Sequence, residues 1–139
     1  MEKRIWIARV LVGIVFAINV QCALQFILWP AAYTGAYQVE GASAEVMVRT
    51  VGLCFLMWNA TYPPVIVHPQ RYRALFGVML AQQTIGLVGE SLILVGLQPG
   101  LEALASSIMR FIAFDAVGLI LLAVAFVITR TRKPCSTHR

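Results

Sequence analysis

The chain has 139 residues, of which 60% are hydrophobic and only 12% are charged. A soluble domain carries about 25% charged residues, so this composition excludes an ordinary water-soluble protein. The net charge of +5 would indicate nucleic-acid binding in a soluble protein, but the basic residues gather where membrane topology explains them. The predicted surrounding is therefore a lipid bilayer, and no nucleic-acid partner is predicted.

Four apolar stretches are each long enough to cross a hydrocarbon core of about 30 Å, which takes about 20 helical residues. They cover residues 5–29, 46–67, 74–97 and 104–129. The predicted fold is all-α: a polytopic membrane protein whose four transmembrane helices form an antiparallel bundle. The connections are too short to fold separately, so residues 1–139 form a single four-helix transmembrane domain that ends in a cationic cytoplasmic tail, 130–139.

The first predicted span ends at Trp29 and Pro30, an interfacial aromatic residue followed by a helix-stopping proline. Its apolar run is longer than a signal-peptide core and lacks a small-residue cleavage site, so we expect the span to be retained. The next connection, 31–45, is the longest loop. It has room for a short interfacial helix over 31–39, which would lie over one face of the bundle as a lid.

The second predicted span runs into Tyr62, Pro63 and Pro64. Two prolines in succession remove backbone hydrogen bonds, so the helix must end or bend there. Two alternatives stay open: the helix stops at Thr61, or it kinks and continues to Val67. The length needed to cross the bilayer favours the second.

The third predicted span contains small residues that allow neighbouring helices to approach closely: Gly77, Gly86, Gly89 and Gly96. It is followed by Gln98, Pro99 and Gly100, a typical short turn. The third and fourth spans are therefore predicted to be antiparallel neighbours.

Basic residues set the predicted orientation. With four spans, both termini and the 68–73 connection share one side of the membrane, and that side carries Lys3, Arg4, Arg9, Arg71, Arg73, Arg130, Arg132, Lys133 and Arg139. Only Arg49 and Arg110 belong to the other half. Because cytoplasmic loops retain Lys and Arg, we expect a multi-pass protein of the inner (plasma) membrane with both termini in the cytoplasm.

Polar residues inside the apolar spans are the candidates for a functional site. A charge near the bilayer centre costs about 2.5–3.5 kcal/mol on insertion scales, so such residues must be paired, solvated or used. The candidates for ligand binding or proton coupling are these polar residues and two neighbouring aromatic ones: Asn19, Trp58, Asn59, Gln83, Glu90, Arg110, Phe111 and Asp115.

The third and fourth spans place two charges at the same depth. Glu90 precedes Gly100 by ten residues and Arg110 follows it by ten. Both therefore lie about 10 Å below the loop if each helical residue rises about 1.5 Å. We predict an ion pair between Glu90 and Arg110.

Asp115 lies deeper and points elsewhere. It is five residues from Arg110, which corresponds to about 140° around a helix at 100° per residue. We therefore expect Asp115 to face the first or second span, near Asn19 or Asn59. Burial disfavours the charged form of a carboxyl group, which makes an unpaired Asp115 the better proton-carrier candidate.

Cofactor and metal chemistry is not predicted. His68 lies in the predicted turn after the second span, and no second histidine lies inside a span to share a haem or zinc ion with it. Cys22, Cys54 and Cys135 form no Cys-x-x-Cys pair, so thiol redox chemistry lacks its neighbouring sulfur atoms.

Short blocks carry a resemblance to known families. Arg9–Gly13, at the start of the first of four spans, together with the glycine-rich third span, resembles DoxX-like small bacterial membrane proteins. The blocks Phe55–Asn59, Gln83–Ser91 and Arg110–Asp115 are similar to the signature blocks of an uncharacterised bacterial four-span family. Such a family implies a small integral membrane protein and no particular activity.

Three functions stay open. The sequence favours a binding or accessory protein, oligomeric or bound to another membrane protein, whose polar cluster is structural or holds a lipid-like or cationic molecule. The second is a small proton- or cation-coupled transporter using Glu90 or Asp115, although the four-span multidrug family places its carboxylate in the first span. The third is an intramembrane acid/base enzyme using the same two carboxyl groups, and no nucleophile, metal set or cofactor motif supports it.

Overall fold

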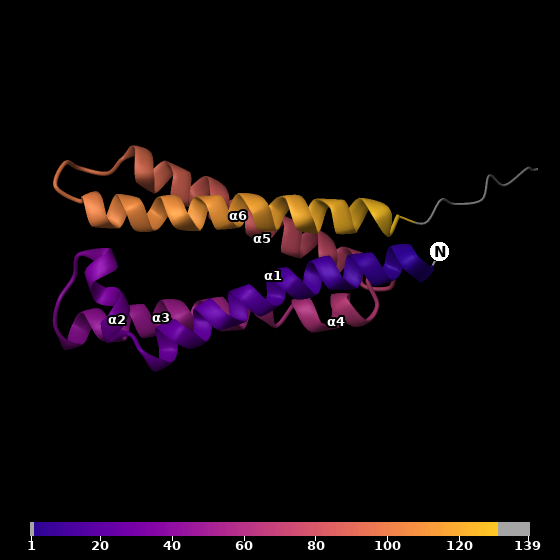
Figure 1. The fold of residues 1–139 in the computed structure, drawn as a ribbon, viewed down its shortest axis with the longest axis horizontal. Coiled ribbons are helices and arrows are strands. Elements are labelled where there is room, and N and C mark those ends of the chain that lie inside the picture. The colour runs from indigo at the N-terminus through magenta and orange to yellow at the C-terminus, as the bar shows by residue number, and fades with distance from the viewer. Residues whose placement is uncertain (1, 131–139) are drawn as a thin grey trace, which may run out of the picture.

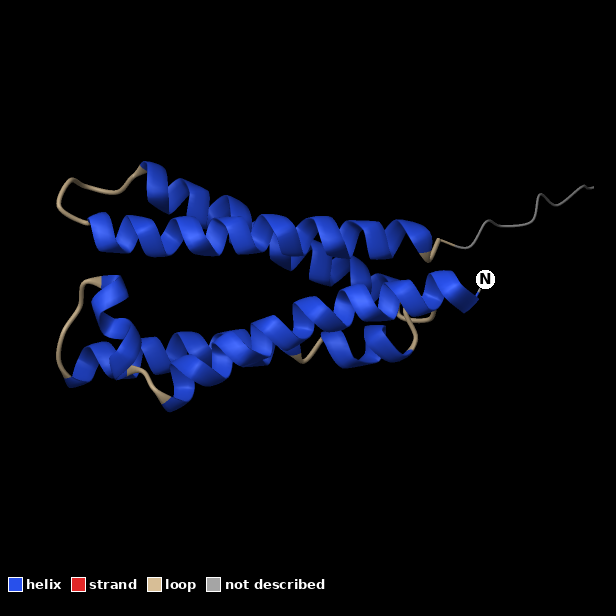
Figure 2. Cartoon of the chain, viewed as in Figure 1, coloured by secondary structure: helices blue, strands red, loops and turns tan. Residues whose placement is uncertain are grey.

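The computed structural model describes residues 2–130, and these residues contain helices and loops but no strand (Figure 2). Four helices are long and apolar enough to cross a membrane: α1 (Glu2–Leu28), α3 with α4 (Ala42–Asn59 and Tyr62–Val67), α5 (Arg73–Val95) and α6 (Glu102–Ile128). The predicted all-α class with four antiparallel membrane helices is confirmed. Most of the predicted tail lies in 131–139, outside the described residues.

The helices begin a few residues earlier than the sequence predicted, since polar residues that the hydropathy pattern excludes still form helical turns. Glu102 opens α6, where a carboxylate is favourable because backbone N–H groups are unpaired at a helix start. At the other end of α1, Pro30 disfavours helical geometry at Trp29, and the helix ends at Leu28.

The second span is broken where the two prolines predicted a bend. Pro63 and Pro64 have no N–H, so the carbonyl groups of Asn59 and Ala60 lose their regular helical partners. The chain tightens through Ala60 and Thr61, whose N–H groups bond three residues back to Met57 at 3.2 Å and Trp58 at 3.5 Å. The helix then resumes as α4, which confirms the kinked, continued span.

The four spans are arranged as two pairs (Figure 1). α1 packs against α3 and α4, α5 packs against α6, and α1 also contacts α6. The helix pairs lie close together at the end that holds Glu2 and Ile128, which we call the terminal end, and diverge toward the other end, which we call the loop end. The apolar core lies in the terminal half and consists of Ala8, Val12, Val15, Tyr62, Val65, Phe76, Met79, Leu122 and Ala125.

The outer faces of the helices are apolar and exposed. Met57, Ile85 and Val95 present 74%, 68% and 87% of their surface outward, as expected of side chains that contact lipid rather than protein. This pattern agrees with a bundle that spans a membrane.

At the loop end, the connection after α1 folds into two short helical segments, α2 (Ala31–Thr34) and η1 (Gly35–Tyr37). The predicted short helix over 31–39 is present as these two segments, which end at Tyr37. α2 contacts α3 and η1 contacts α6, so the segment bridges the two helix pairs. Gln38 follows η1 and joins this loop to the α5–α6 connection: it donates to the Gly100 carbonyl at 3.0 Å and accepts from the Leu104 N–H at 3.1 Å.

Candidate functional site

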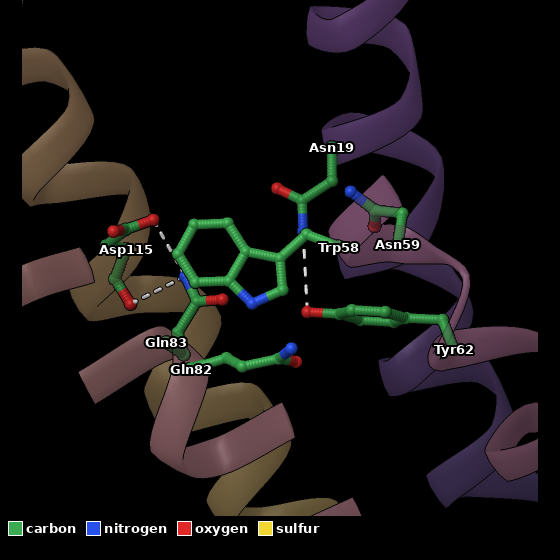
Figure 3. A pocket seen from close by; sticks show the side chains of 7 residues that line it. All are labelled: Asn19, Trp58, Asn59, Tyr62, Gln82, Gln83 and Asp115. Carbon is green, nitrogen blue, oxygen red and sulfur yellow. Dashed lines mark hydrogen bonds between the residues drawn. The ribbon is translucent and has the colours of Figure 1, made fainter. Parts of the chain in front are cut away.

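A small polar cavity lies at the middle of the bundle, where the apolar core ends. Its volume is about 40 Å³, and side chains from all four spans converge on it (Figure 3). Space of this size holds a few water molecules or an ion, because one water needs roughly 10–15 Å³ on the same measure. We call it the inner cavity; its lining is Asn19, Trp58, Asn59, Tyr62, Gln82, Gln83 and Asp115.

Asp115 and Gln83 join α5 to α6 beside the inner cavity. The Gln83 amide donates to Asp115 Oδ1 at 2.8 Å. Two glycines make room for this pair: a Cβ atom on Gly86 would lie 2.6 Å from Asp115 Oδ2, and one on Gly118 would lie 3.0 Å from Gln83 Nε2. Each polar side chain therefore lies against the glycine of the opposite helix, which explains the close approach of α5 and α6.

On the opposite wall, the amide of Asn19 in α1 donates to the Tyr62 hydroxyl at 3.4 Å. Asn59, the last residue of α3, donates to the Phe55 carbonyl at 2.7 Å. Asn59 is only 4% exposed, and its Oδ1 atom has no hydrogen-bond partner. A buried polar atom without a partner is costly, so the unpaired oxygen is an unusual feature of a residue that lines the inner cavity.

A second and larger pocket lies toward the loop end, where the helix pairs diverge. Its volume is about 270 Å³, and it lies between α1, η1 and α6. We call it the outer pocket; its lining is Ile18, Cys22, Gln25, Phe26, Tyr33, Ala36, Tyr37, Ser107, Arg110, Phe111 and Phe114.

Aromatic rings form one wall of the outer pocket. The Phe26 ring lies 4.7 Å from Tyr33 and 6.1 Å from Phe111 between centroids. Polar groups complete the lining: Tyr33 donates to Gln25 at 3.0 Å, and Arg110 supplies a positive charge. None of the described residues that line this pocket is a carboxylate.

Tyr37 reaches the outer pocket from η1, outside the spans. Burial raises the pKa of its phenol to about 12, and the nearby Cys22 and Glu90 side chains act in the same direction. The hydroxyl therefore keeps its proton at physiological pH and remains available to donate a hydrogen bond.

The predicted ion pair between Glu90 and Arg110 is not formed among the described residues. Glu90 is half-buried, its Oε2 atom has no hydrogen-bond partner, and Arg110 lines the outer pocket instead. Asp115 faces α5 through Gln83, so Arg110, about 140° around the helix, points away from α5. The hairpin spacing predicts equal depth for the two residues, but depth does not fix the direction in which a side chain points.

The structure distributes the other candidates between the two pockets. Asn19, Trp58, Asn59, Gln83 and Asp115 come together in the inner cavity, so the expectation that Asp115 lies near Asn19 and Asn59 is met there. Its direct partner, however, is on α5. Arg110 and Phe111 line the outer pocket, and Glu90 lines neither.

Sequence reasoning missed several lining residues. In the inner cavity these are Tyr62 and Gln82. Tyr62 was considered only as part of the proline break, and Gln82 could have been found as the neighbour of Gln83, because two adjacent glutamines are unusual inside an apolar span. In the outer pocket sequence reasoning missed the buried Ser107 of α6. It also missed Gln25, Tyr33 and Tyr37. They belong to a helix end and a loop, which hydropathy does not distinguish from ordinary interfacial residues.

Comparison of the chain with protein-family models, with curated proteins and with solved structures finds no match. The resemblance to DoxX-like proteins therefore stays a prediction. The fold and the site define the class: a bundle of four helices that are able to span a membrane, with a polar cavity at its middle and an aromatic pocket at one end.

Proposed function

We propose that the protein is a membrane-embedded binding protein whose outer pocket holds an amphipathic, lipid-like molecule. The observation that carries this proposal is the pocket's combination of size and lining. Small-molecule sites are concave, about 300–1,000 Å³ and mostly apolar with a few placed polar groups. The outer pocket, at about 270 Å³, lies just below this range, and its aromatic wall has Arg110, Gln25 and Tyr33 around it.

The charge of the lining selects among ligands. Arg110 supplies a positive charge, and none of the described lining residues carries a carboxylate. An anionic or neutral head group therefore fits the outer pocket better than a cationic one. Apolar chains would lie along Ile18, Phe26 and Phe111. The preferred ligand is therefore a single-chain amphipath with an acidic or hydrogen-bonding head.

We further propose that the outer pocket opens toward the outer face of the plasma membrane. Lys3, Arg4, Arg71 and Arg73 belong to the terminal end, and Glu40 and Glu102 belong to the loop end. Lys and Arg are retained in the cytoplasm, so this distribution supports cytoplasmic termini.

The second candidate function is a proton- or cation-coupled transporter, and the third is an intramembrane acid/base enzyme. A multidrug-type transporter needs its carboxylate inside a pocket of ligand size. Asp115 instead lines a cavity of about 40 Å³, and Glu90 lines neither pocket. These positions favour binding without turnover.

Two photoactivatable probes with the same dodecyl chain and opposite head groups, a carboxylate and a trimethylammonium, test the proposal in nanodiscs. We expect saturable labelling of α1 and α6 lining residues by the carboxylate probe, competed by unlabelled dodecanoate. Arg110→Gln is expected to weaken binding of the carboxylate probe about tenfold, since hydrogen bonds to charged groups contribute about 1.5–3 kcal/mol. Arg49→Gln, an exposed arginine outside the lining, is the matched control. Equal labelling by both probes, or labelling that Arg110→Gln does not change, would refute the proposal.

A further inference from the structure

The inner cavity is separate from the outer pocket, and its oxygens are arranged for a different kind of ligand. Asn19, Asn59 and Gln83 each use their NH₂ group in a hydrogen bond to protein: to Tyr62, to the Phe55 carbonyl and to Asp115. Among residues 2–130 no hydrogen bond uses their amide oxygens, and Asn59 Oδ1 is buried without a partner. Gln82 Oε1, in the same lining, is a second buried oxygen without a partner. The inner cavity therefore presents several acceptor oxygens beside the donors of Gln82, Trp58 and Tyr62.

Asp115 lacks a positive partner. Its carboxylate accepts one hydrogen bond from Gln83, and no Lys or Arg within residues 2–130 forms an ion pair with it. A charged carboxylate at mid-span is costly, so it must bind either a proton or a cation.

The break in the second span lies at the same place. Asn59 and Tyr62 flank the break and both line the inner cavity, while the carbonyl groups of Asn59 and Ala60 have lost their helical partners to Pro63 and Pro64. Interrupted membrane helices whose unwound carbonyls face a polar cavity are a recurring way to coordinate a small cation.

The size of the inner cavity and the chemistry of its lining limit which ligand can occupy it. A cavity of about 40 Å³ excludes an organic amine of drug size. The lining has no His or Cys, which excludes the usual ligands of zinc and copper and leaves the hard cations that prefer oxygen. A single carboxylate balances one positive charge, whereas a divalent ion would leave an excess charge in an apolar interior.

We propose that the inner cavity binds a sodium ion through the Asp115 carboxylate and the amide oxygens of Asn59 and its neighbours. The site is independent of the outer pocket and does not require an amphipathic ligand. Its rival occupants are a proton on Asp115 and water alone.

Trp58 lines the inner cavity and serves as the probe. Replacing the exposed Trp6 and Trp29 by Phe leaves Trp58 as the single tryptophan. We would titrate this protein in nanodiscs with NaCl at constant ionic strength, using choline chloride as the balancing salt, above neutral pH so that protons compete weakly. The expected result is a saturable change in Trp58 emission with Na⁺, weaker with K⁺.

Asp115→Asn keeps an oxygen for Gln83 but removes the charge, and we expect it to weaken the Na⁺ response at least about tenfold, the size of a charge-assisted contact. Asn59→Leu removes the unpartnered Oδ1 atom and should weaken the Na⁺ response by less than Asp115→Asn does. Glu102 is a carboxylate at the start of α6, outside the inner cavity, so Glu102→Gln should leave the Na⁺ response unchanged. Trp58 emission that does not respond to Na⁺, or that responds equally in Asp115→Asn, would mean that only water or a proton occupies the cavity and would overturn the proposal.

Discussion

The terminal and loop halves of the bundle are packed in different ways. In the terminal half, side chains of α1, α4, α5 and α6 meet in one core around the fully buried Phe76 and Met79. In the loop half, α1 stays packed on α3, and α6 meets them through the Phe111 ring, 6.1 Å from Phe26 and 6.2 Å from Phe55. The outer pocket lies beside this contact, between α1, η1 and α6. The difference separates a packed terminal half, which holds the helices together, from a loop half that contains the pocket of the proposed function.

Removing the same side chain from each half gives the largest expected contrast. Phe76→Ala in the core should cost about 3–5 kcal/mol of unfolding free energy, because it leaves a cavity that the packed helices cannot close. Phe111→Ala, in the wall of an existing pocket, should cost only about 1 kcal/mol, since only part of its surface has packed neighbours. SDS titration followed by circular dichroism measures both. Equal costs would mean that the two halves are packed alike.

The close contact between α1 and α3 provides the next test. A Cβ atom on Gly52 would lie 2.9 Å from the Ala23 carbonyl oxygen, and backbone cannot move aside as a side chain can. Gly52→Ala should therefore destabilise the protein by about 1–3 kcal/mol. Gly13→Ala is the matched control because nothing lies within 4 Å of its added Cβ, so it should be neutral or slightly stabilising. The same unfolding assay applies, and a Gly52→Ala protein as stable as the control would contradict the close packing.

Beside the inner cavity, a Gly→Ala substitution at Gly86 should lower the unfolding free energy by less. The Cβ of Gly86→Ala would meet Asp115 Oδ2, the end of a side chain that is able to turn away. We expect a loss of about 1 kcal/mol, the net value of the hydrogen bond from Gln83. A double-mutant cycle with Gln83→Leu measures the coupling. Fully additive effects would show that Gly86 does not act through this pair.

The smallest effect on stability is expected at the loop end. Gln38→Ala removes the two hydrogen bonds that join the η1 loop to Gly100 and Leu104, both exposed, so the unfolding free energy should fall by only about 0.5–1 kcal/mol. The same change should loosen the segment that lines the outer pocket and increase the rate at which Cys22 reacts with a thiol reagent. Unchanged reactivity would indicate that this link does not control access.

Local patterns predicted the fold well and the site only in part. The four spans follow from the lengths of the apolar runs, and the break in the second follows from Pro63 and Pro64, since both are properties of one segment. The polar residues of the inner cavity stood out because polar groups are rare in spans. Their partners depend on how each helix is rotated, which is why Arg110 was assigned to the wrong neighbour.

The outer pocket could not be predicted from the sequence. It exists because the two helix pairs diverge and the α2–η1 segment crosses from α3 to α6, and both features depend on packing between residues far apart in the chain. In the sequence Phe26 was not distinguished from other apolar residues, and Phe111 was a candidate only as an aromatic neighbour of the polar residues. Only the arrangement of α1 against α6 turns them into the wall of a pocket.

The accessibility of Cys22 tests the central claim, that the loop half holds an open ligand pocket, most directly. Cys22 lines the outer pocket, so in a Cys54→Ala, Cys135→Ala background it is the single thiol. We predict that a membrane-impermeant thiol reagent added to the outside of intact cells modifies Cys22 and that dodecanoate protects it. Modification only from the cytoplasmic side would contradict the proposed orientation. No modification from either side, or modification that dodecanoate does not slow, would contradict the ligand pocket.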